Sequence, residues 1–537
     1  MSTTKLSLRE RLATTDEFVT VTELVPWRGA TADRAGRAGL AAARALVDDP
    51  RVAALSITDN AGGHAMAHPA LIAEEFLARG QDVIVHVACR DRSRNGLLSL
   101  AWELERRGVR NVLAVSGDHP TEGFEGLSRP VFDVDSVGLL AFYRDLVNQG
   151  AGDAGAARDT SASRGASASR DSSATGDPAE PGFFLGCAVS PFKRLEAEVV
   201  PQYLKLALKV RAGADFVIPQ LGYDARTWDE LLRWMRRADL RVPALANVYV
   251  LSRTVARLFN ANRIPGCVVS DELLAVAERE AAAADKGRAF FLELAARQVA
   301  IARGLGFRGV YLAGNLPAAD VARVLDTAAG YAPDDWRMFA REIAYTQSGS
   351  FRFFAGDRAT GLATDELAPA YARTLTPRTR GRARRRVSPW YKANRMAHRA
   401  VFAPGTPGFR AAGRVYGQLE RVHLGRPLHV LEQAVKVPLY DCRDCGDCSL
   451  PDVAYLCPES QCPKGERNGP CGGSLDGICE VLPRRCVWVR AYERLKPYGE
   501  ELTMLERAPV IVDNRLRRTS AWANTFLERD HFAKGNP

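Results

Sequence analysis

The sequence predicts an α/β protein, a (β/α)8 TIM-type barrel followed by a small cysteine-rich metal-binding domain. Three observations predict this fold class. Short apolar runs alternate with helical patterns from about residue 17 to 330, these runs are almost continuously apolar, and eight of the eleven cysteines follow residue 441. Continuous apolar runs are typical of parallel strands that are covered on both faces. Eight strand–helix units favour a closed barrel, and a doubly wound open sheet is the alternative.

Eight segments have the composition of buried strands: 17–25, 53–59, 83–89, 111–117, 183–189, 216–222, 242–250 and 309–315. Helical patterns lie between them, for example over 93–107, 196–211 and 317–329. The barrel is therefore expected over residues 15–330. Residues 150–182 interrupt it and contain no aliphatic side chain larger than alanine. Such a segment cannot offset its ordering entropy, so a disordered insertion in a surface loop is predicted.

The rest of the chain divides by composition. Residues 331–436 predict a helical and loop connecting region, in which six arginines between Arg378 and Arg386 indicate a solvated linker. Residues 437–515 form the predicted cysteine-rich domain. The start of the chain has no apolar signal segment, and no apolar run approaches a membrane span, so a cytoplasmic protein without a membrane partner is expected.

The chain has a net charge of +10, and a basic chain of this kind suggests nucleic acid as one candidate partner. The arginine run carries part of this excess, lies outside the cysteine-rich domain and is not interleaved with aromatic residues. A nucleic-acid-binding protein is therefore the weakest of three functional hypotheses, and no nucleic-acid partner is expected.

The cysteines of the last hundred residues predict a metal or cluster site, because clustered thiols in a cytoplasmic protein indicate metal ligands before disulfides. The expected ligands are Cys442, Cys445, Cys448, Cys457, Cys462, Cys471, Cys479 and Cys486. The C-x2-C-x2-C spacing suits an iron–sulfur cubane, whereas paired arms suit zinc. Eight residues separate the third and fourth cysteines, so the ferredoxin pattern is incomplete. One cluster with one zinc, or two sites, would use all eight thiols. Cys89, Cys187 and Cys267 are expected to be buried core thiols.

Polar residues are few at the predicted carboxyl ends of the barrel strands, where such barrels place their chemistry. Glu23 lies within an apolar strand; burial would raise its pKa and suit a general acid, and a structural salt bridge is the alternative. Gln220 must find partners, either a heterocycle's amide edge or a loop backbone. Alone, His86 is more often a satisfied core histidine, and a turn cap is the alternative for Asp118.

Taken together, these residues resemble the methylenetetrahydrofolate reductase family. The resemblance rests on Glu23, on "HVAC" (86–89), on "GDHP" (117–120) and on "KVRAGADFVIPQLGYD" (209–224), and it covers roughly residues 15–330. It implies a flavin oxidoreductase of one-carbon metabolism that reduces 5,10-methylenetetrahydrofolate to 5-methyltetrahydrofolate. It also implies bound FAD as the hydride carrier, and a nicotinamide cofactor or an electron-transfer protein as the donor. Self-association is left open.

The resemblance also implies roles for single residues. Glu23 would help to protonate the pterin, Gln220 would bind the pterin ring, and Asp118 would contact folate close to the flavin. Thr58, His86 and Lys209 match positions that hold FAD.

This chain departs from the family pattern at several places. It has Ser116 where the family has Arg, Ala88 where it has Thr, Ser190–Pro191 where it has Tyr-Pro, and Asp59–Asn60 where it has Tyr-Gly. These departures fall mainly on the flavin side, while the folate side is retained. They motivate an alternative function, a flavin-independent, folate-dependent methyltransferase acting on a corrinoid or a thiol.

A second resemblance covers about residues 437–497. "CRDCGDC", "CPKGERNGPCGG" and "DGICEV" are similar to the cysteine-rich C-terminal domain that accompanies some methylenetetrahydrofolate reductases and that forms a separate partner subunit in acetogenic bacteria. The eight crowded thiols would then belong to a fused module that binds an iron–sulfur cluster or zinc.

Overall fold

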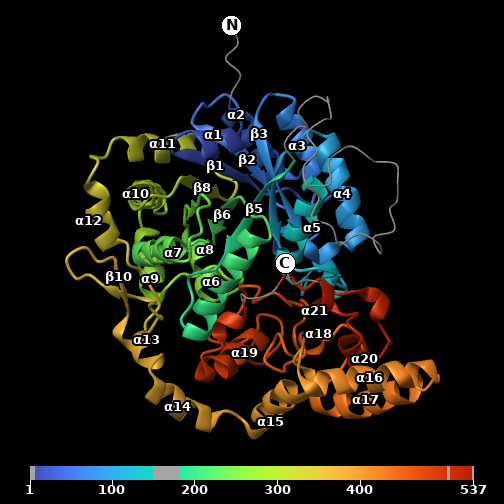
Figure 1. The fold of residues 1–537 in the computed structure, drawn as a ribbon. Helices are drawn as coiled ribbons and strands as arrows, with labels where there is room; N and C mark the ends of the chain where they lie inside the picture. The colour runs from blue at the N-terminus through green and yellow to red at the C-terminus, as the bar shows by residue number, and fades with distance from the viewer. Residues whose placement is uncertain (1–5, 122, 149–181, 505–507, 535–537) are drawn as a thin grey trace.

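The computed structural model describes residues 6–121, 123–148, 182–504 and 508–534. Except for its last residue, the insertion predicted at 150–182 lies outside these ranges. Figure 1 shows a barrel of strands surrounded by helices, with the last third of the chain gathered against one side of it.

Eight parallel strands form the barrel. They are β1 (Val19–Leu24), β2 (Val52–Ile57), β3 (Asp82–Ala88), β4 (Asn111–Val115), β5 (Phe184–Val189), β6 (Phe216–Pro219), β7 (Leu245–Tyr249) and β8 (Gly309–Ala313). The strand order is β6-β5-β4-β3-β2-β1-β8-β7. A parallel bridge between Val217 and Ala244 links the two end strands, and the Val217 amide donates to the Pro243 carbonyl over 2.9 Å. The sheet therefore closes on itself, and the predicted TIM-type barrel is confirmed over the open doubly wound sheet.

Helices follow the strands and cover the outside of the barrel (Figure 1). They are α2 (Arg34–Leu46), α3 (Pro69–Leu77), α4 (Arg94–Arg106), α5 (Ser136–Asn148), α6 (Glu196–Arg211), α7 (Ala225–Arg237), α8 (Arg253–Asn260), α9 (Asp271–Glu280), α10 (Arg288–Leu305) and α11 (Ala318–Ala329). The helical patterns that the sequence showed at 93–107, 196–211 and 317–329 correspond to α4, α6 and α11. The predicted and observed bounds differ by at most one residue.

Helix α1 (Leu8–Thr14) closes the amino-terminal end of the barrel. Its first amide donates to the carboxylate of Asp82, the residue that begins β3, over 2.7 Å. Leu8 and Leu12 are buried in one cluster with inward-facing strand residues such as Val21 and Ile84. Any site must therefore lie at the opposite end, where the strands reach their carboxyl termini.

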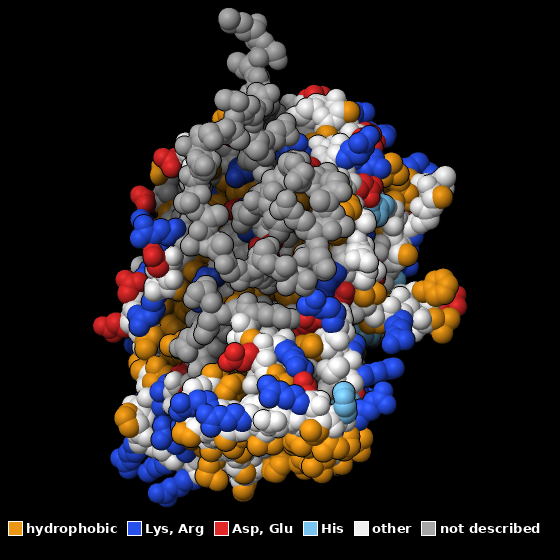
Figure 2. Space-filling model, turned by 45° about the vertical axis from the view of Figure 1, so that its right-hand side comes forward, with side chains coloured by type: hydrophobic (Ala, Val, Ile, Leu, Met, Phe, Trp, Pro, Cys, Tyr) orange, Lys and Arg blue, Asp and Glu red, His pale blue; other side chains and the backbone are white. Residues whose placement is uncertain are grey.

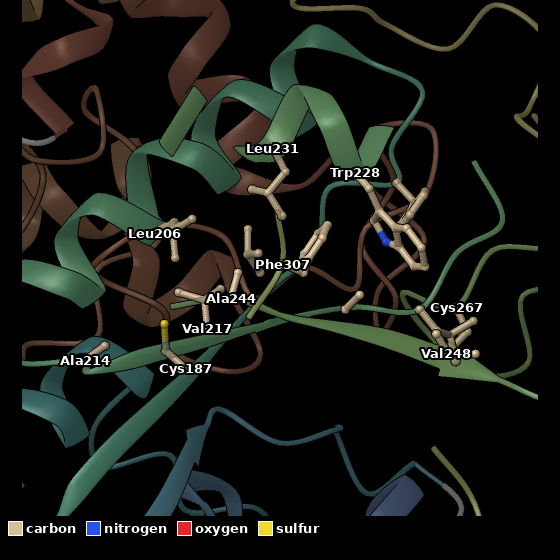
Figure 3. Packing of buried hydrophobic residues seen from close by; sticks show 14 of the residues in the cluster. Cys187, Leu206, Ala214, Val217, Trp228, Leu231, Ala244, Val248, Cys267 and Phe307 are labelled. Carbon is tan, nitrogen blue, oxygen red and sulfur yellow. The ribbon is translucent and has the colours of Figure 1, made fainter. Parts of the chain in front are cut away.

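The main core lies between the strands and the covering helices. Figure 3 shows Trp228, Leu231 and Phe307 packed over β-strand residues, with Cys187 and Cys267 among the apolar side chains. Cys89 is also buried. The prediction that these three cysteines are core thiols is confirmed.

The connecting region contains more regular structure than the sequence predicted. It has α12 (Asp335–Glu342), a two-stranded antiparallel sheet of β9 (Phe354–Gly356) and β10 (Ala363–Leu367), and the helices α13 (Pro369–Thr374), α14 (Pro377–Arg386), α15 (Pro389–Ala397), α16 (Pro407–Arg421) and α17 (Gly425–Tyr440). The small sheet was not predicted. The expected arginine-rich linker is helix α14, and two of its arginines bind the cysteine-rich part: Arg380 pairs with Glu501, and Arg384 donates to the Pro497 carbonyl.

The cysteine-rich part has little regular structure. Its helices are α18 (Pro458–Gln461), α19 (Val487–Leu495), α20 (Ala521–Phe526) and α21 (His531–Lys534). Helix α19 packs against α6 of the barrel, as Figure 1 shows. Nowhere in the described ranges is there a helix both long and apolar enough to cross a membrane.

Candidate functional site

A chain of hydrogen bonds crosses the barrel interior and begins at Glu23. Its Oε1 accepts from the Tyr311 hydroxyl over 2.7 Å, and its Oε2 accepts from the Gly314 amide over 2.6 Å. The Tyr311 hydroxyl lies 3.4 Å from Nε2 of His86, which in turn lies 2.8 Å from the Ser56 hydroxyl. Strands β1, β8, β3 and β2 thus bring an acid, a phenol, an imidazole and a hydroxyl into one network.

Burial sets the protonation state of this network. It raises the pKa of Glu23 above its usual value, although the hydrogen bonds from Tyr311 and Gly314 act in the opposite direction. Burial also lowers the pKa of His86 to about 4. Burial thus shifts Glu23 toward its protonated form and His86 toward its neutral form, and the Tyr311 hydroxyl lies between the two side chains. This pairing suits proton donation at the end of β1.

The loops after β2 and β4 are joined by one buried arginine. Arg90 is 1 % exposed and donates to the carbonyl of Asp118 and to the carbonyl of Asn60, each over 2.9 Å. Gly117 precedes Asp118 with φ +85°, and a Cβ there would lie 3.1 Å from the Cβ of Ala88. Glycine is therefore required for this turn, which fixes the position of the Asp118 backbone.

Gln220 follows β6 and binds its own loop. Its Oε1 accepts from the Leu221 amide over 2.9 Å. Its Nε2 points toward Gly266: if that glycine carried a Cβ atom, the atom would lie 3.4 Å from Nε2. That same Cβ would lie 3.6 Å from the carbonyl oxygen of Gly472, in the cysteine-rich part. A Cβ on Gly472 would lie 2.5 Å from the Ser190 hydroxyl, so only glycine permits this approach. The cysteine-rich part therefore reaches the loop beside Gln220.

Residues 464–474, here called the covering loop, hold this position through two lysines. Lys464 of the loop donates to the Gly117 carbonyl over 2.8 Å and pairs with Glu480. Lys193, just after β5, donates to the Ser474 carbonyl over 2.6 Å. The carboxyl end of the barrel is thus built by the barrel and by the cysteine-rich part together.

Buried polar contacts anchor the covering loop more deeply. Lys205 of α6 and Glu466 form an ion pair of 2.5 Å, with side chains only 2 % and 1 % exposed. The Asn468 side chain donates to both carboxylate oxygens of Asp135 over 3.0 and 3.1 Å. These contacts join segments more than 260 residues apart in the sequence. They indicate one cooperative unit rather than two loosely attached domains.

Of the three residues expected to hold a flavin, Thr58, Lys209 and His86, the last two already bind other groups of the protein. The Thr58 hydroxyl is buried and has no hydrogen-bond partner among the described residues, which fits a ligand. Lys209 donates to the Ala188 carbonyl over 2.6 Å, and burial lowers its pKa. His86 belongs to the Glu23 network. Asp59, at a position where the chain departs from the family pattern, forms a 2.5 Å ion pair with Arg92. The fit to a flavin is therefore incomplete.

Four of the expected metal ligands surround one small cavity. Cys442, Cys445, Cys448 and Cys457 line it together with Lys436 of α17. The Lys436 ammonium lies 3.5 Å from the Cys448 sulfur and 2.9 Å from its ion-pair partner Glu432. Four thiols suit either zinc or an iron–sulfur cluster, and a neighbouring cation offsets the negative charge of such a site.

The other four cysteines lie in the covering loop or close to it in sequence. Backbone hydrogen bonds from Cys479 to Arg484 and from Cys486 to Gly477 fold their segment into a hairpin. The Cys471 sulfur lies 3.6 Å from Oε1 of Glu480, the partner of Lys464. Burial raises the pKa of Cys471 most, followed by the charge of Glu480, and the Cys462 thiol adds a smaller effect in the same direction. Burial also raises the pKa of Cys486, and the Cys479 thiol adds to this effect. The structure thus divides the cysteines into a first set (442, 445, 448, 457) and a second set (462, 471, 479, 486).

Neither set closes around a single ion. Within the part of the chain that the structure describes, no three or more His, Cys, Asp or Glu side chains are arranged to hold a metal ion. The donor chemistry of both sets fits a metal or cluster, and their assignment as ligands stays a prediction.

Several residues of this site were not predicted from the sequence. Tyr311 is an inward polar residue in an apolar strand, the same signal that singled out Glu23, and could have been found that way. Arg90 follows the "HVAC" motif directly. Lys464 gave no local signal, because its partners lie in the barrel.

Comparison with known proteins confirms the second resemblance and the first part of the first one; residues 149–330, which include Lys209 and Gln220, lie outside the match. Residues 10–148 match the family model described as "Methylenetetrahydrofolate reductase", and residues 423–514 match the one described as "Methylene-tetrahydrofolate reductase C terminal". The chain therefore carries one segment similar to the reductase family and one similar to its C-terminal domain. No curated protein matches the sequence.

Solved structures show distant likeness. One is an "Uncharacterized protein from Clostridium thermocellum" that "binds two copies of 5-methyl-5,6,7,8-tetrahydrofolic acid", with 10 % identity, a TM-score of 0.39, and coverage of 60 % of this chain and 97 % of that one. Another is 2,3-dimethylmalate lyase, with 14 % identity, a TM-score of 0.33, and coverage of 60 % and 84 %. A third is oxaloacetate acetylhydrolase, with 12 % identity, a TM-score of 0.33, and coverage of 63 % and 94 %. At these scores none of them carries a functional argument.

Proposed function

We propose that this chain, which joins a methylenetetrahydrofolate reductase segment to the C-terminal segment of that family, is a cytoplasmic enzyme that reduces 5,10-methylenetetrahydrofolate to 5-methyltetrahydrofolate. The observation that carries the proposal is the buried Glu23 carboxyl at the end of β1. Tyr311 and Gly314 hold it in place, and burial raises its pKa. The family match over residues 10–148 supplies the substrate class.

Glu23 acts as the proton donor in this proposal. Its proton passes to the bridging nitrogen that leaves when the five-membered ring of the substrate opens, and the methylene carbon is left as an iminium cation. Hydride addition to that carbon gives the methyl group, so one proton and one hydride enter for each product formed. The Tyr311 hydroxyl remains on Oε1 and positions the carboxyl for this step.

Asp118 and Gln220 orient and stabilise the substrate. The negative charge of the Asp118 carboxylate would stabilise the positive charge of the iminium. Hydrogen bonds from Arg90 to the Asp118 carbonyl and from Lys464 to the Gly117 carbonyl hold this turn in place. Gln220 offers both a donor and an acceptor to the pterin edge once its contact with Leu221 is exchanged.

The reducing electrons come from a bound group or from a soluble donor. A flavin would supply hydride chemistry close to Thr58. The buried Thr58 hydroxyl has no hydrogen-bond partner among the described residues and would be available to hold the flavin. Iron–sulfur centres held by the two cysteine sets would deliver electrons one at a time. The physiological donor is then a reduced nicotinamide or an electron-transfer protein.

The first test is anaerobic purification, followed by a visible spectrum with iron and zinc measured on the same sample. Flavin bands together with a broad iron–sulfur absorption would support a reductase supplied with electrons through the cysteines. Formation of 5-methyltetrahydrofolate with a reduced viologen dye tests the reaction itself. Replacing Glu23 by Gln should lower this rate about 100-fold or more, because the proton donor is lost.

A second candidate function is a flavin-independent, folate-dependent methyltransferase acting on a corrinoid or a thiol. The observation in its favour is that His86 and Lys209 already have internal partners. A colourless protein that carries only zinc, binds 5-methyltetrahydrofolate and gains no reductase activity from added FAD would favour it over the reductase.

A further inference from the structure

Helices α16 and α17 present a broad apolar face to solvent. Its members are exposed by 37 to 69 %: Val415, Val422, Leu424, Val430, Leu431, Val435, Val437 and Leu439. Figure 2 shows hydrophobic side chains gathered along the lower edge of the molecule, where Figure 1 places these two helices. An exposed apolar surface built by two neighbouring helices is typical of an interaction site.

Helix α17 has a different, buried face on its other side. Glu432 is fully buried there and Lys436 is 3 % exposed. Gln433, Lys436 and Tyr440 line the cavity of the first cysteine set, and the Lys436 ammonium contacts the Cys448 sulfur. The exposed apolar face is therefore separated from the cysteine cavity by the thickness of one helix, about 10 Å.

The charge of this region is strongly one-sided. Residues 377–440 contain fourteen Lys and Arg side chains and two Glu, a net charge of +12 in sequence, whereas the whole chain carries +10. The remainder of the chain is therefore slightly acidic. Part of the charge of residues 377–440 is offset by Glu500 and Glu501, which pair with Arg380, Arg395 and Arg399. Arg410, Arg414, Arg421 and Arg426 are exposed on or between α16 and α17. Figure 2 shows Lys and Arg side chains above and beside the apolar surface.

We propose that the apolar face of α16 and α17 is the docking surface for an acidic electron-carrier protein, which would deliver electrons to an iron–sulfur cluster held by the first cysteine set. This inference rests on the proposed function, since it names the class of donor. Apolar contacts in the centre with complementary charge around them are the usual anatomy of a transient protein interface. The thickness of one helix between the docked carrier and the cysteine cavity keeps the two redox sites close.

Charge and location favour this occupant over two others. A second copy of the chain would bring the exposed arginines of α16 and α17 against the same arginines, and like charges oppose such contact. An anionic lipid surface would match the apolar and basic groups, but it would not explain why the face backs directly onto the cysteine cavity. Both are outcomes that the experiment below distinguishes.

The binding test uses the full-length protein, purified anaerobically, and a bacterial ferredoxin of strongly negative net charge as the probe. The variant carries Leu431→Glu and Val435→Glu, both exposed substitutions on α17. The matched control carries Leu71→Glu and Met338→Glu, exposed apolar residues on α3 and α12. We expect the α17 variant to weaken ferredoxin binding about tenfold or more, with the control unchanged and both proteins equally stable.

A charge variant tests the complementarity separately. Arg414→Gln with Arg421→Gln should weaken ferredoxin binding and flatten its dependence on salt, because two interfacial charges are lost. A kinetic measurement then links binding to turnover. Reduction of methylenetetrahydrofolate by reduced ferredoxin should fall in the α17 variant, whereas reduction by a small viologen dye should not.

The outcomes are distinct for the inference and for the proposed function. If the wild-type protein shows no dye-driven reduction, the proposed function fails, and the binding data still decide whether the face takes an acidic protein. Absence of salt-sensitive ferredoxin binding, or binding unaffected by the α17 variant, overturns the inference. It is also overturned if the wild-type protein binds vesicles of anionic phospholipid, or forms a dimer, and the α17 variant abolishes that association instead.

Discussion

Lys464, in the cysteine-rich part, donates a hydrogen bond through Nζ to the carbonyl oxygen of Gly117, 347 residues earlier in the chain and directly before Asp118. The same ammonium is paired with Glu480, next to Cys479 in sequence. One side chain therefore connects the turn that presents Asp118 with the second cysteine set. The proposed folate site is consequently a product of both family segments.

Replacing Lys464 by Met should weaken binding of 5-methyltetrahydrofolate about tenfold, because the turn that carries Asp118 loses a buried anchor. Titration calorimetry under anaerobic conditions measures this affinity. Lys286→Met, an exposed lysine on the barrel, is the matched control and should bind like the wild type. Equal affinities for all three proteins would show that the covering loop does not help to build the site.

The buried pair of Lys205 and Glu466 should dominate the attachment of the covering loop. Lys205→Met leaves the Glu466 charge unpaired in the interior, so the free energy of unfolding should fall by about 3–5 kcal/mol. Adding Glu466→Leu should restore most of it. Urea unfolding measures both variants, with the fully exposed pair of Arg241 and Asp239 as a control whose loss should change the stability far less. Equal losses from the buried and the exposed pair would contradict this prediction.

The stability of the barrel should depend on His86 between pH 7 and pH 5. Burial lowers the pKa of His86 to about 4 in the folded state, whereas an unfolded histidine titrates near 6.5. Protonation therefore favours the unfolded chain as the pH falls below about 6.5, and folding stability decreases. Between pH 7 and pH 5 this one group should remove about 2 kcal/mol. A His86→Gln variant should lack this part of the decrease, which denaturant unfolding at several pH values will show; parallel pH profiles would refute the assignment.

The two cysteine sets should bind metal independently. Cys445→Ser should remove the metal held by the first set and leave the second, and Cys471→Ser should do the reverse. Iron and zinc analysis, with the visible spectrum of each variant, measures the loss. Cys187→Ser, in the barrel core, is the control and should retain the full metal content. Complete loss of metal in either single variant, with the fold preserved, would indicate one shared site instead.

The barrel was predictable from the sequence because each of its strands is a local apolar run and each covering helix has a local period. The network around Glu23 was only half predictable. The carboxylate stands out in an apolar strand, but its partner Tyr311 comes from the opposite end of the barrel sequence and depends on closure of the sheet. Lys464 could not be predicted at all, since its role exists only once two distant segments meet.

The arginine-rich segment shows how a local signal can be overlooked. Its high charge suggested a solvated linker, and none of its residues is buried. The segment is nevertheless helical: Thr376 caps the helix through the Thr379 amide, and Pro377 occupies the first turn. Both are strong helix-start signals, and they outweigh the repulsion between neighbouring arginines. The connecting sheet of β9 and β10 was missed for another reason, because three- and five-residue strands leave almost no periodicity.

The covering loop and the barrel belong to one polypeptide, and this has a kinetic consequence. If the two were separate chains, their contact would depend on concentration, and dilution would open the carboxyl end of the barrel. Here the intervening helices keep Lys464 permanently available to Gly117, at an effective concentration that dilution cannot lower. Specific activity should therefore stay constant from micromolar to nanomolar enzyme, unlike that of an assembly that must find its second subunit.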